Sequence, residues 1–236
     1  MFRFKGIRSK RTTVIVLVLM AAVLSGCVGP RGWPGVASNG NDTLFVGTAD
    51  GRVLALDADY VLSDQFVSEL AKLNPTGDIG GYRASFTYCI LGKMLRGSLY
   101  PPVSVLFNWV NSSFYQDGHT QRISVRGRIC DLEAKIYHDD RKPLKAWLLA
   151  QQKYMKLECI QLQEKNWSEV SPTGRLRKLR ILMPFIVLFY CLFRKGLILD
   201  GRAGLFYTMQ RTTAECILSL YLLEGDLKKI SRGDNA

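Results

Sequence analysis

The spacing of apolar residues changes several times along the chain, and each change marks an expected structural element. The strand-like runs lie at 43–48, 52–57 and 81–137, and the helix-like runs lie at 63–73, 143–165, 181–193 and 203–223. Alternation of apolar and polar residues is typical of strands, whereas a spacing of three and four residues is typical of helices. The pattern predicts an α/β or α+β fold with a small mixed sheet from about residue 43 to 137 and a helical C-terminal third.

The N-terminal segment has the form of a secretory signal peptide, and an apolar helix is expected there. Five basic residues among the first eleven precede an unbroken apolar run from Val14 to Leu24, and small residues precede Cys27. The run is short for a transmembrane helix. The sequence "LSGC" resembles the bacterial lipobox, which implies that residues 1–27 are a lipoprotein signal peptide and that Cys27 carries the lipid. The alternative is an ordinary membrane anchor in which LSGC occurs by chance.

Residues 28–56 contain two short apolar runs joined by an Asp-Gly turn of the hairpin type. The stretch "RGWPGVASNGNDTLFVGTADGRVLALDA" resembles a single repeat of a PQQ-type β-propeller. Several blades must pack face to face to close a propeller, and no second copy follows in the sequence. One repeat therefore cannot form a propeller by itself.

The apolar run from Ile181 to Phe193 lies between basic clusters in "RLRKLRILMPFIVLFYCLFRK". Its thirteen residues are short for a membrane span, and Pro184 is expected to kink the helix. The favoured interpretation is an interfacial or re-entrant helix, with the flanking basic residues at anionic lipid headgroups. The alternative is a buried hairpin formed with the helix at 203–223.

The formal net charge of +12 is unevenly distributed. Residues 141–236 contain 17 Lys and Arg against 8 Asp and Glu, and the first eleven residues contain no acid. This distribution favours membrane lipids or phosphate-bearing ligands as partners. The basic residues flank apolar runs and no nucleic-acid-binding motif is present, so nucleic acid is not an expected partner.

Five short sequence pieces occur in a fixed order between "LDADYVLSDQF" and "YLLEGDL". They are "LDADYVLS", "GYRASFTYCILGKMLRGSLYPP", "YQDGHTQR", "IYHDDRKPLKAWLLAQQKYMKLE" and "LDGRAGLFYTMQRTTAE". Together they resemble the C-terminal half of a bacterial family 2 glycosyltransferase of the GT-A fold, over about residues 55–227. The resemblance implies a partial GT-A catalytic region at 57–142 and a helical, membrane-associated region at 143–236.

Asp57 and Asp59 alternate at the end of an apolar strand, where both carboxylates could reach one hard divalent cation. In the resembled family this is the DXD motif, which implies Mg²⁺ or Mn²⁺ bound against the diphosphate of a nucleotide-sugar donor. His138 in "YHDDRK" matches a late histidine that completes the metal or phosphate site of many GT-A enzymes. The alternatives are a solvated turn for the two aspartates and an exposed helix N-terminus for the charged cluster around His138.

Asp117 lies in "YQDGH", at the position where the resembled family has an acidic residue that acts as general base toward the acceptor hydroxyl. Such a carboxylate needs partial desolvation to raise its pKa, and Phe114 and Tyr115 could provide it. Gln116 replaces the glutamate of the family motif. The neighbouring His119 is the alternative base.

Glycosyltransferases of this family carry a nucleotide-binding half before the DXD strand, but only 58 residues precede Asp59 here. We therefore expect a truncated transferase, acting on a lipid-linked or membrane-proximal acceptor, whose activity is in question without its donor-binding half. Such an enzyme would work at the cytoplasmic face of the inner membrane. If the signal is used, the chain is instead lipid-anchored outside the cytoplasm, and the alternative function is a non-enzymatic lipoprotein that binds a partner through its propeller-like segment.

Overall fold

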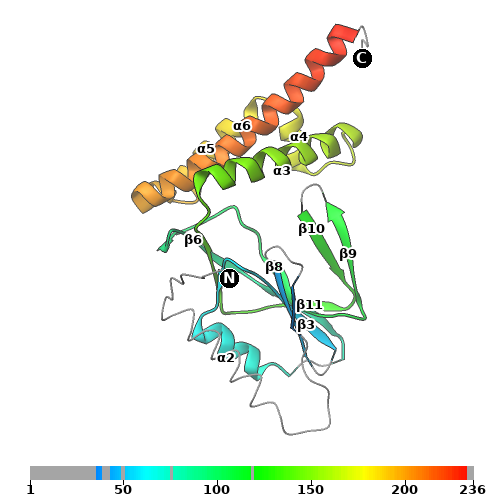
Figure 1. The fold of residues 1–236 in the computed structure, drawn as a ribbon, viewed down its shortest axis with the longest axis vertical. Coiled ribbons are helices and arrows are strands. Elements are labelled where there is room, and N and C mark those ends of the chain that lie inside the picture. The colour runs from blue at the N-terminus through cyan, green and yellow to red at the C-terminus, as the bar shows by residue number, and fades with distance from the viewer. Residues whose placement is uncertain (1–35, 39–42, 49–50, 75–76, 118–119, 233–236) are drawn as a thin grey trace, which may run out of the picture.

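The computed structural model describes residues 36–38, 43–48, 51–74, 77–117 and 120–232 (Figure 1). Within them the chain is an α+β protein in which mixed sheets lie beneath a layer of helices, so the expected mixed fold and helical C-terminal third are confirmed. The expected signal peptide, with Cys27, lies outside the described residues.

The strands are short and are numbered in chain order. They are β1 (Val36–Ser38), β2 (Thr43–Gly47), β3 (Arg52–Asp57), β4 (Tyr60–Val61), β5 (Ile79–Ala84), β6 (Phe86–Ile90), β7 (Lys93–Met94), β8 (Val103–Asn108), β9 (Ser112–Asp117), β10 (Thr120–Val125), β11 (Arg128–Asp131) and β12 (Ile136–Asp140). The helices are α2 (Asp64–Lys72), α3 (Leu144–Glu164), α4 (Pro172–Lys178), α5 (Leu182–Phe189), the π-helical turn η1 (Tyr190–Arg194), the 3₁₀ turn η2 (Leu197–Asp200) and α6 (Gly201–Arg232).

The hairpin expected from the propeller-like segment is present, and it belongs to a larger sheet. β2 and β3 pair antiparallel, and β3 continues the pairing with β8 in a six-stranded sheet of order β1-β2-β3-β8-β5-β11. A four-stranded sheet of order β4-β12-β6-β7 has β6 and β12 parallel at its centre, and β9 with β10 forms a separate two-stranded sheet. The six-stranded sheet therefore combines residues 36–57 with residues 79–131.

Helix α2 begins where the sequence predicts. The Ser63 hydroxyl accepts a hydrogen bond from the Phe66 backbone N–H at 3.1 Å, which satisfies one of the free N–H groups of the first turn. The Phe66 side chain is fully buried in a core cluster with Leu56, Tyr82 and Val105. This cluster joins α2 to β3, β5 and β8.

Helix α3 confirms the helix expected near 143–165, but its buried face differs from the expected one. Its buried residues are Trp147, Gln151, Met155, Cys159 and Leu162. The apolar spacing of the sequence predicts Leu144 and Leu148 on the same side as Trp147, Met155, Cys159 and Leu162, but both leucines are exposed. The buried residues repeat at intervals of three and four, so they form one stripe along the helix. The apolar members of this stripe pack against Ala214, Leu218 and Leu222 of α6.

The apolar run at 181–193 forms α5 and η1, which pack against η2 and α6. Pro184 lies in the first turn of α5. Backbone N–H groups in the first turn of a helix have no acceptor within the helix, so a proline there breaks no hydrogen bond. The expected kink at this proline does not occur. Met183, Val187 and Cys191 are buried in a cluster with Tyr88 of β6 and Tyr207 of α6. The helical layer is thereby attached to the four-stranded sheet.

The length and apolarity of the helices bear on membrane crossing. No single helix in the described part of the chain is long and apolar enough to cross a membrane. One bent pair, Leu182–Arg194 followed by Leu197–Arg232, meets the requirement by length and composition, with a bend of 71° between its two parts.

A network of buried charges fixes α4 against α3 and α6. The Arg177 guanidinium donates to Glu215 of α6 at 3.0 Å and to Glu158 of α3 at 2.9 Å. Both carboxylates are largely buried, and the Arg177 side chain is 24% exposed. Because water cannot fully solvate these carboxylates, the Arg177 guanidinium stabilises both of their charges.

We expect Arg177→Met to lower the free energy of unfolding by about 3 kcal/mol, because the substitution removes a cation that two largely buried carboxylates share. Urea denaturation of the full chain, followed by circular dichroism, measures the loss. Lys156→Met, an exposed substitution on α3, is the matched control and should change stability by less than about 0.5 kcal/mol. Equal effects of the two substitutions would contradict this account of the network.

Candidate functional site

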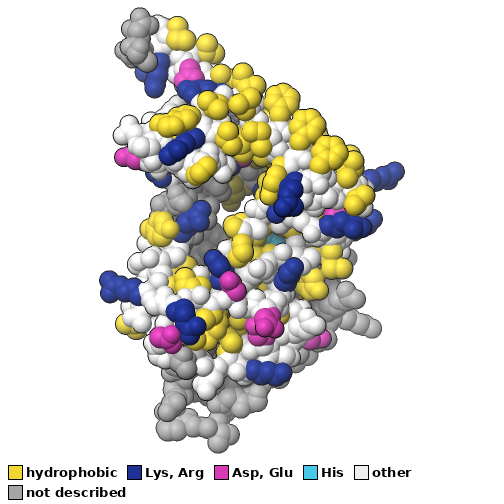
Figure 2. All heavy atoms as spheres, turned by 180° about the vertical axis from the view of Figure 1, so that it is seen from behind, with side chains coloured by type: hydrophobic (Ala, Val, Ile, Leu, Met, Phe, Trp, Pro, Cys, Tyr) yellow, Lys and Arg dark blue, Asp and Glu magenta, His cyan; other side chains and the backbone are white. Residues whose placement is uncertain are grey.

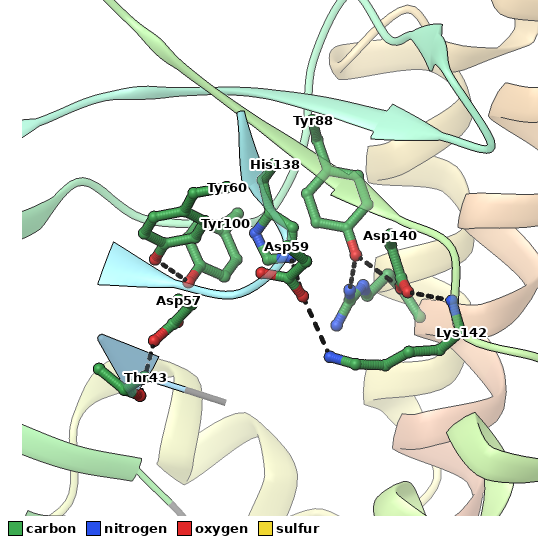
Figure 3. A network of polar contacts seen from close by, with 10 residues as sticks. Thr43, Asp57, Asp59, Tyr60, Tyr88, Tyr100, His138, Asp140 and Lys142 are labelled. Carbon is green, nitrogen blue, oxygen red and sulfur yellow. Dashed lines mark hydrogen bonds and ion pairs between the residues drawn. The ribbon is translucent and has the colours of Figure 1, made fainter. Parts of the chain in front are cut away.

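The candidate site lies where β4, β12 and β6 meet in the four-stranded sheet. His138 of β12 is in register with Tyr60 of β4 and with Tyr88 of β6. Side chains of paired residues project on the same side of a sheet, so these three rings gather on one face (Figure 3). The ring centroids of Tyr60 and Tyr88 lie 5.5 and 4.6 Å from that of His138.

Asp59 follows β3 and points at His138 (Figure 3). Its Oδ2 atom lies 3.2 Å from His138 Nε2 and accepts a hydrogen bond from Lys142 Nζ at 3.1 Å. Burial alone would raise the pKa of Asp59, but the hydrogen bond and charge of His138, together with Lys142, outweigh it and lower this pKa to about 2. Asp59 is therefore a carboxylate at neutral pH.

Two polar atoms of this pair have no partner among the described residues. Asp59 Oδ1 and His138 Nδ1 are both buried and make no hydrogen bond. Buried polar atoms are nearly always satisfied, so two open atoms on contacting side chains indicate a site that a ligand could complete. A carboxylate oxygen and an imidazole nitrogen are ordinary metal-ligand atoms, and this pair fits a divalent cation.

Asp57 occupies a different environment from Asp59. It is the last residue of β3, and its Oδ1 accepts a hydrogen bond from Thr43 Oγ1 at 3.0 Å across the β2–β3 hairpin (Figure 3). The strand ends between the two aspartates, so they do not continue one regular alternation. Within the described ranges, no three His, Cys, Asp or Glu side chains are grouped to hold a metal ion.

The aromatic wall around His138 was missed by the sequence analysis. The Tyr100 ring lies 4.5 Å from His138, and the hydroxyls of Tyr60 and Tyr100 share a hydrogen bond of 2.8 Å. Burial, followed by the effect of Tyr100 and Asp57, raises the pKa of Tyr60 far above its usual range, and burial raises that of Tyr100 to about 12. Both hydroxyls stay protonated and can donate hydrogen bonds. The only signal in the sequence for this wall was the spacing of Phe86 and Tyr88, which places two aromatic rings on the same face of a strand.

Asp139 and Asp140 lie in β12 and are buried, so the alternative of an exposed helix N-terminus is wrong for them. The Asp139 carboxylate accepts from the Gly92 N–H at 2.8 Å and from Arg141 Nε at 2.6 Å. The Asp140 carboxylate accepts from the Tyr88 hydroxyl at 3.0 Å and from the Lys142 N–H at 3.1 Å. Each buried charge in this strand is thus held by a specific donor.

Of the two expected general bases, Asp117 is the last residue of β9, and its backbone is in register with Thr120 of β10. His119 lies outside the described residues. Their assignment as general bases stays a prediction.

The comparisons with known proteins return no match: no family model, curated protein or solved structure matches this chain. The chemistry of the site is therefore argued from its own residues, chiefly Asp59 and His138.

We expect Asp59 to stabilise the fold in a pH-dependent way. Its pKa falls from the usual 3.8 to about 2 on folding, so its contribution of about 2 kcal/mol is present above pH 4 and is lost as the pH falls toward 2. The free-energy difference between the wild type and Asp59→Asn, measured with a chelator present, should shrink over that window. Glu133→Gln, at an exposed carboxylate, is the control. A difference that stays constant from pH 7 to pH 2 would contradict the shift.

Proposed function

We propose that this chain carries the metal-binding part of a family 2 glycosyltransferase, which transfers a sugar from a nucleotide-sugar donor to a lipid-linked acceptor at a membrane surface. The observation that carries the proposal is the contact of Asp59 with His138, each of which has a buried atom without a partner. The five ordered sequence pieces that resemble this family include both residues. Their approach in space, from positions 79 residues apart, agrees with the shared role that the resemblance implies.

The residues that would hold the cation are Asp59 and His138. A carboxylate and an imidazole together suit Mn²⁺ better than Mg²⁺, which strongly prefers oxygen ligands. A bound divalent cation would neutralise charge on the diphosphate of the donor. Lys142 would hold the Asp59 carboxylate in place, and the rings of Tyr60 and Tyr100 would hold the His138 ring.

Asp59→Asn and His138→Gln should each weaken Mn²⁺ binding at least tenfold, because each removes one of the two ligands. Asp57→Asn should weaken it less, since the Asp57 carboxylate is bound to Thr43. Titration of the full chain with Mn²⁺, followed by electron paramagnetic resonance of the free ion, measures the affinities, and turnover of nucleotide sugars by the wild type tests the reaction. Asp131→Asn, at an exposed carboxylate, is the control. A wild type that binds no Mn²⁺ would contradict the proposal and favour the partner-binding lipoprotein.

The membrane part of the proposal is supported by an exposed apolar surface, here named the α5–α6 outer face. Figure 2 shows hydrophobic side chains in a continuous row along the helical layer. Its members are Ile181, Leu182, Phe185, Ile186, Phe189, Phe193, Ile198, Leu199, Leu205, Phe206 and Met209. Large contiguous apolar surfaces mark interaction sites, and an acyl-chain boundary would cover this one.

The structure revises which basic residues could reach lipid headgroups. Arg177 is bound to two carboxylates, and Arg180 forms a two-pronged ion pair with Asp226. Neither guanidinium is free to contact lipid without losing these partners. Arg194 and Arg202 are exposed beside the α5–α6 outer face, and with the half-buried Lys195 they could reach the headgroups.

We expect the full chain to sediment with vesicles that contain anionic lipid. The triple substitution Phe185→Ser, Phe189→Ser and Phe193→Ser should weaken vesicle binding more than tenfold, since burial of each ring contributes about 2 kcal/mol. Arg194→Gln with Arg202→Gln should weaken binding to anionic vesicles but not to neutral ones, by about 1 kcal/mol for each charge.

The matched control for these vesicle experiments is Lys153→Gln, an exposed basic residue of α3. It should leave the vesicle-bound fraction unchanged. A wild type that stays in the supernatant with vesicles of every composition would overturn the membrane part of the proposal while leaving the metal site to its own test.

A further inference from the structure

Arg211 of α6 reaches the candidate site from the helical layer. Its guanidinium lies over the rings of Tyr207 and Tyr88, with centroid distances of 4.9 and 5.7 Å, and its Nη2 donates a hydrogen bond to the Tyr88 hydroxyl at 3.2 Å. A guanidinium is attracted to aromatic faces, so both rings hold it in place. Arg211 Nε is buried and has no partner in the described part of the chain.

Tyr88 connects Arg211 to Asp140 and His138 of the candidate site. Its hydroxyl donates to Asp140 Oδ2 at 3.0 Å, and its ring lies 4.6 Å from that of His138. Asp140 in turn accepts the Lys142 N–H, and the Lys142 ammonium holds Asp59. A continuous series of polar contacts therefore leads from α6 to the proposed cation ligands, through residues that β6 and β12 place side by side.

A second connection reaches His138 from the other side. The Asp200 carboxylate, just before α6, accepts the Arg96 backbone N–H at 2.8 Å, and the Tyr207 hydroxyl accepts the Leu99 N–H at 2.7 Å. The next residue, Tyr100, packs its ring on His138. Residues 96–100 are thus attached to η2 through Asp200 and to α6 through Tyr207, and they place Tyr100 against the imidazole.

From these contacts we infer that α6 is part of the site and that Arg211 is a positioning residue for it. Arg211 orients the Tyr88 hydroxyl toward Asp140, and Tyr88 in turn confines the His138 ring and the Lys142 backbone. The effect on cation binding rests on the proposed function, whereas the ordering of β12 by Arg211 does not. The site is complete only while the inner side of α6 contacts β6.

The test compares Arg211→Met, Arg211→Lys and Tyr88→Phe in the full chain. Two quantities are measured: hydrogen exchange of the β12 backbone amides, and affinity for Mn²⁺. Arg211→Met should speed β12 exchange and weaken Mn²⁺ binding about tenfold, and Arg211→Lys should restore part of both, since its ammonium can still donate to the Tyr88 hydroxyl. Tyr88→Phe keeps the ring and removes only the hydroxyl, so it should reproduce the loss. The Arg211→Met and Tyr88→Phe double variant should be no worse than either single one.

Arg232→Met is the matched control, because Arg232 is an exposed arginine on the same helix. Unchanged β12 exchange in both Tyr88→Phe and Arg211→Met, or an equal effect of Arg232→Met, would overturn the inference. If Arg211→Met fails to fold, Tyr88→Phe decides the question. If the wild type binds no Mn²⁺, the proposed function fails, and the exchange measurement still decides whether Arg211 orders β12.

Discussion

The structure depends on the burial of three consecutive ionisable residues, His138, Asp139 and Asp140, in strand β12, which lies between β4 and β6. A charged group away from water is costly unless specific donors or counter-charges surround it. Each of the three therefore requires a partner that the neighbouring elements must supply. Asp59 contacts His138. Arg141 and the Gly92 amide donate hydrogen bonds to Asp139, and the Tyr88 hydroxyl and the Lys142 amide donate to Asp140. These requirements determine where β4, β6, the β6–β7 turn and the start of α3 can lie.

Helices α5 and α6 have an inner face that packs on the sheet and an outer face that does not. Their inner residues cover Tyr88 and Ile90 of β6 and complete the apolar cluster on that side of the sheet. Their outer residues have no protein to cover them in the described part of the chain (Figure 2). A single helix pair therefore both closes a polar site and presents a surface suited to an apolar phase.

The hairpin expected from the propeller-like segment is part of a six-stranded sheet and not of a propeller blade. The β2–β3 hairpin is present as the sequence predicts, but β3 uses its other edge to pair with β8. An open strand edge favours pairing with any strand of suitable length and spacing, because its N–H and C=O groups need partners. The pairing also brings Asp57 to Thr43, whereas Asp59 lies beyond the end of β3 and contacts His138.

The sequence by itself determined the local elements and pointed to two residues of the candidate site. The strands and the helices at 63–73 and 143–165 followed from apolar spacing, and the family resemblance implied a shared role for Asp57, Asp59 and His138, of which Asp59 and His138 are in contact. Those features depend on neighbouring residues or on sequence order alone. Only the tertiary structure decided that Leu144 and Leu148 are exposed and that Asp57 faces Thr43. It alone brought Tyr88, Tyr100 and Arg211 to the site, because contacts between residues as far apart as 88 and 211 arise from the packing of a helix on a sheet, which no local spacing encodes.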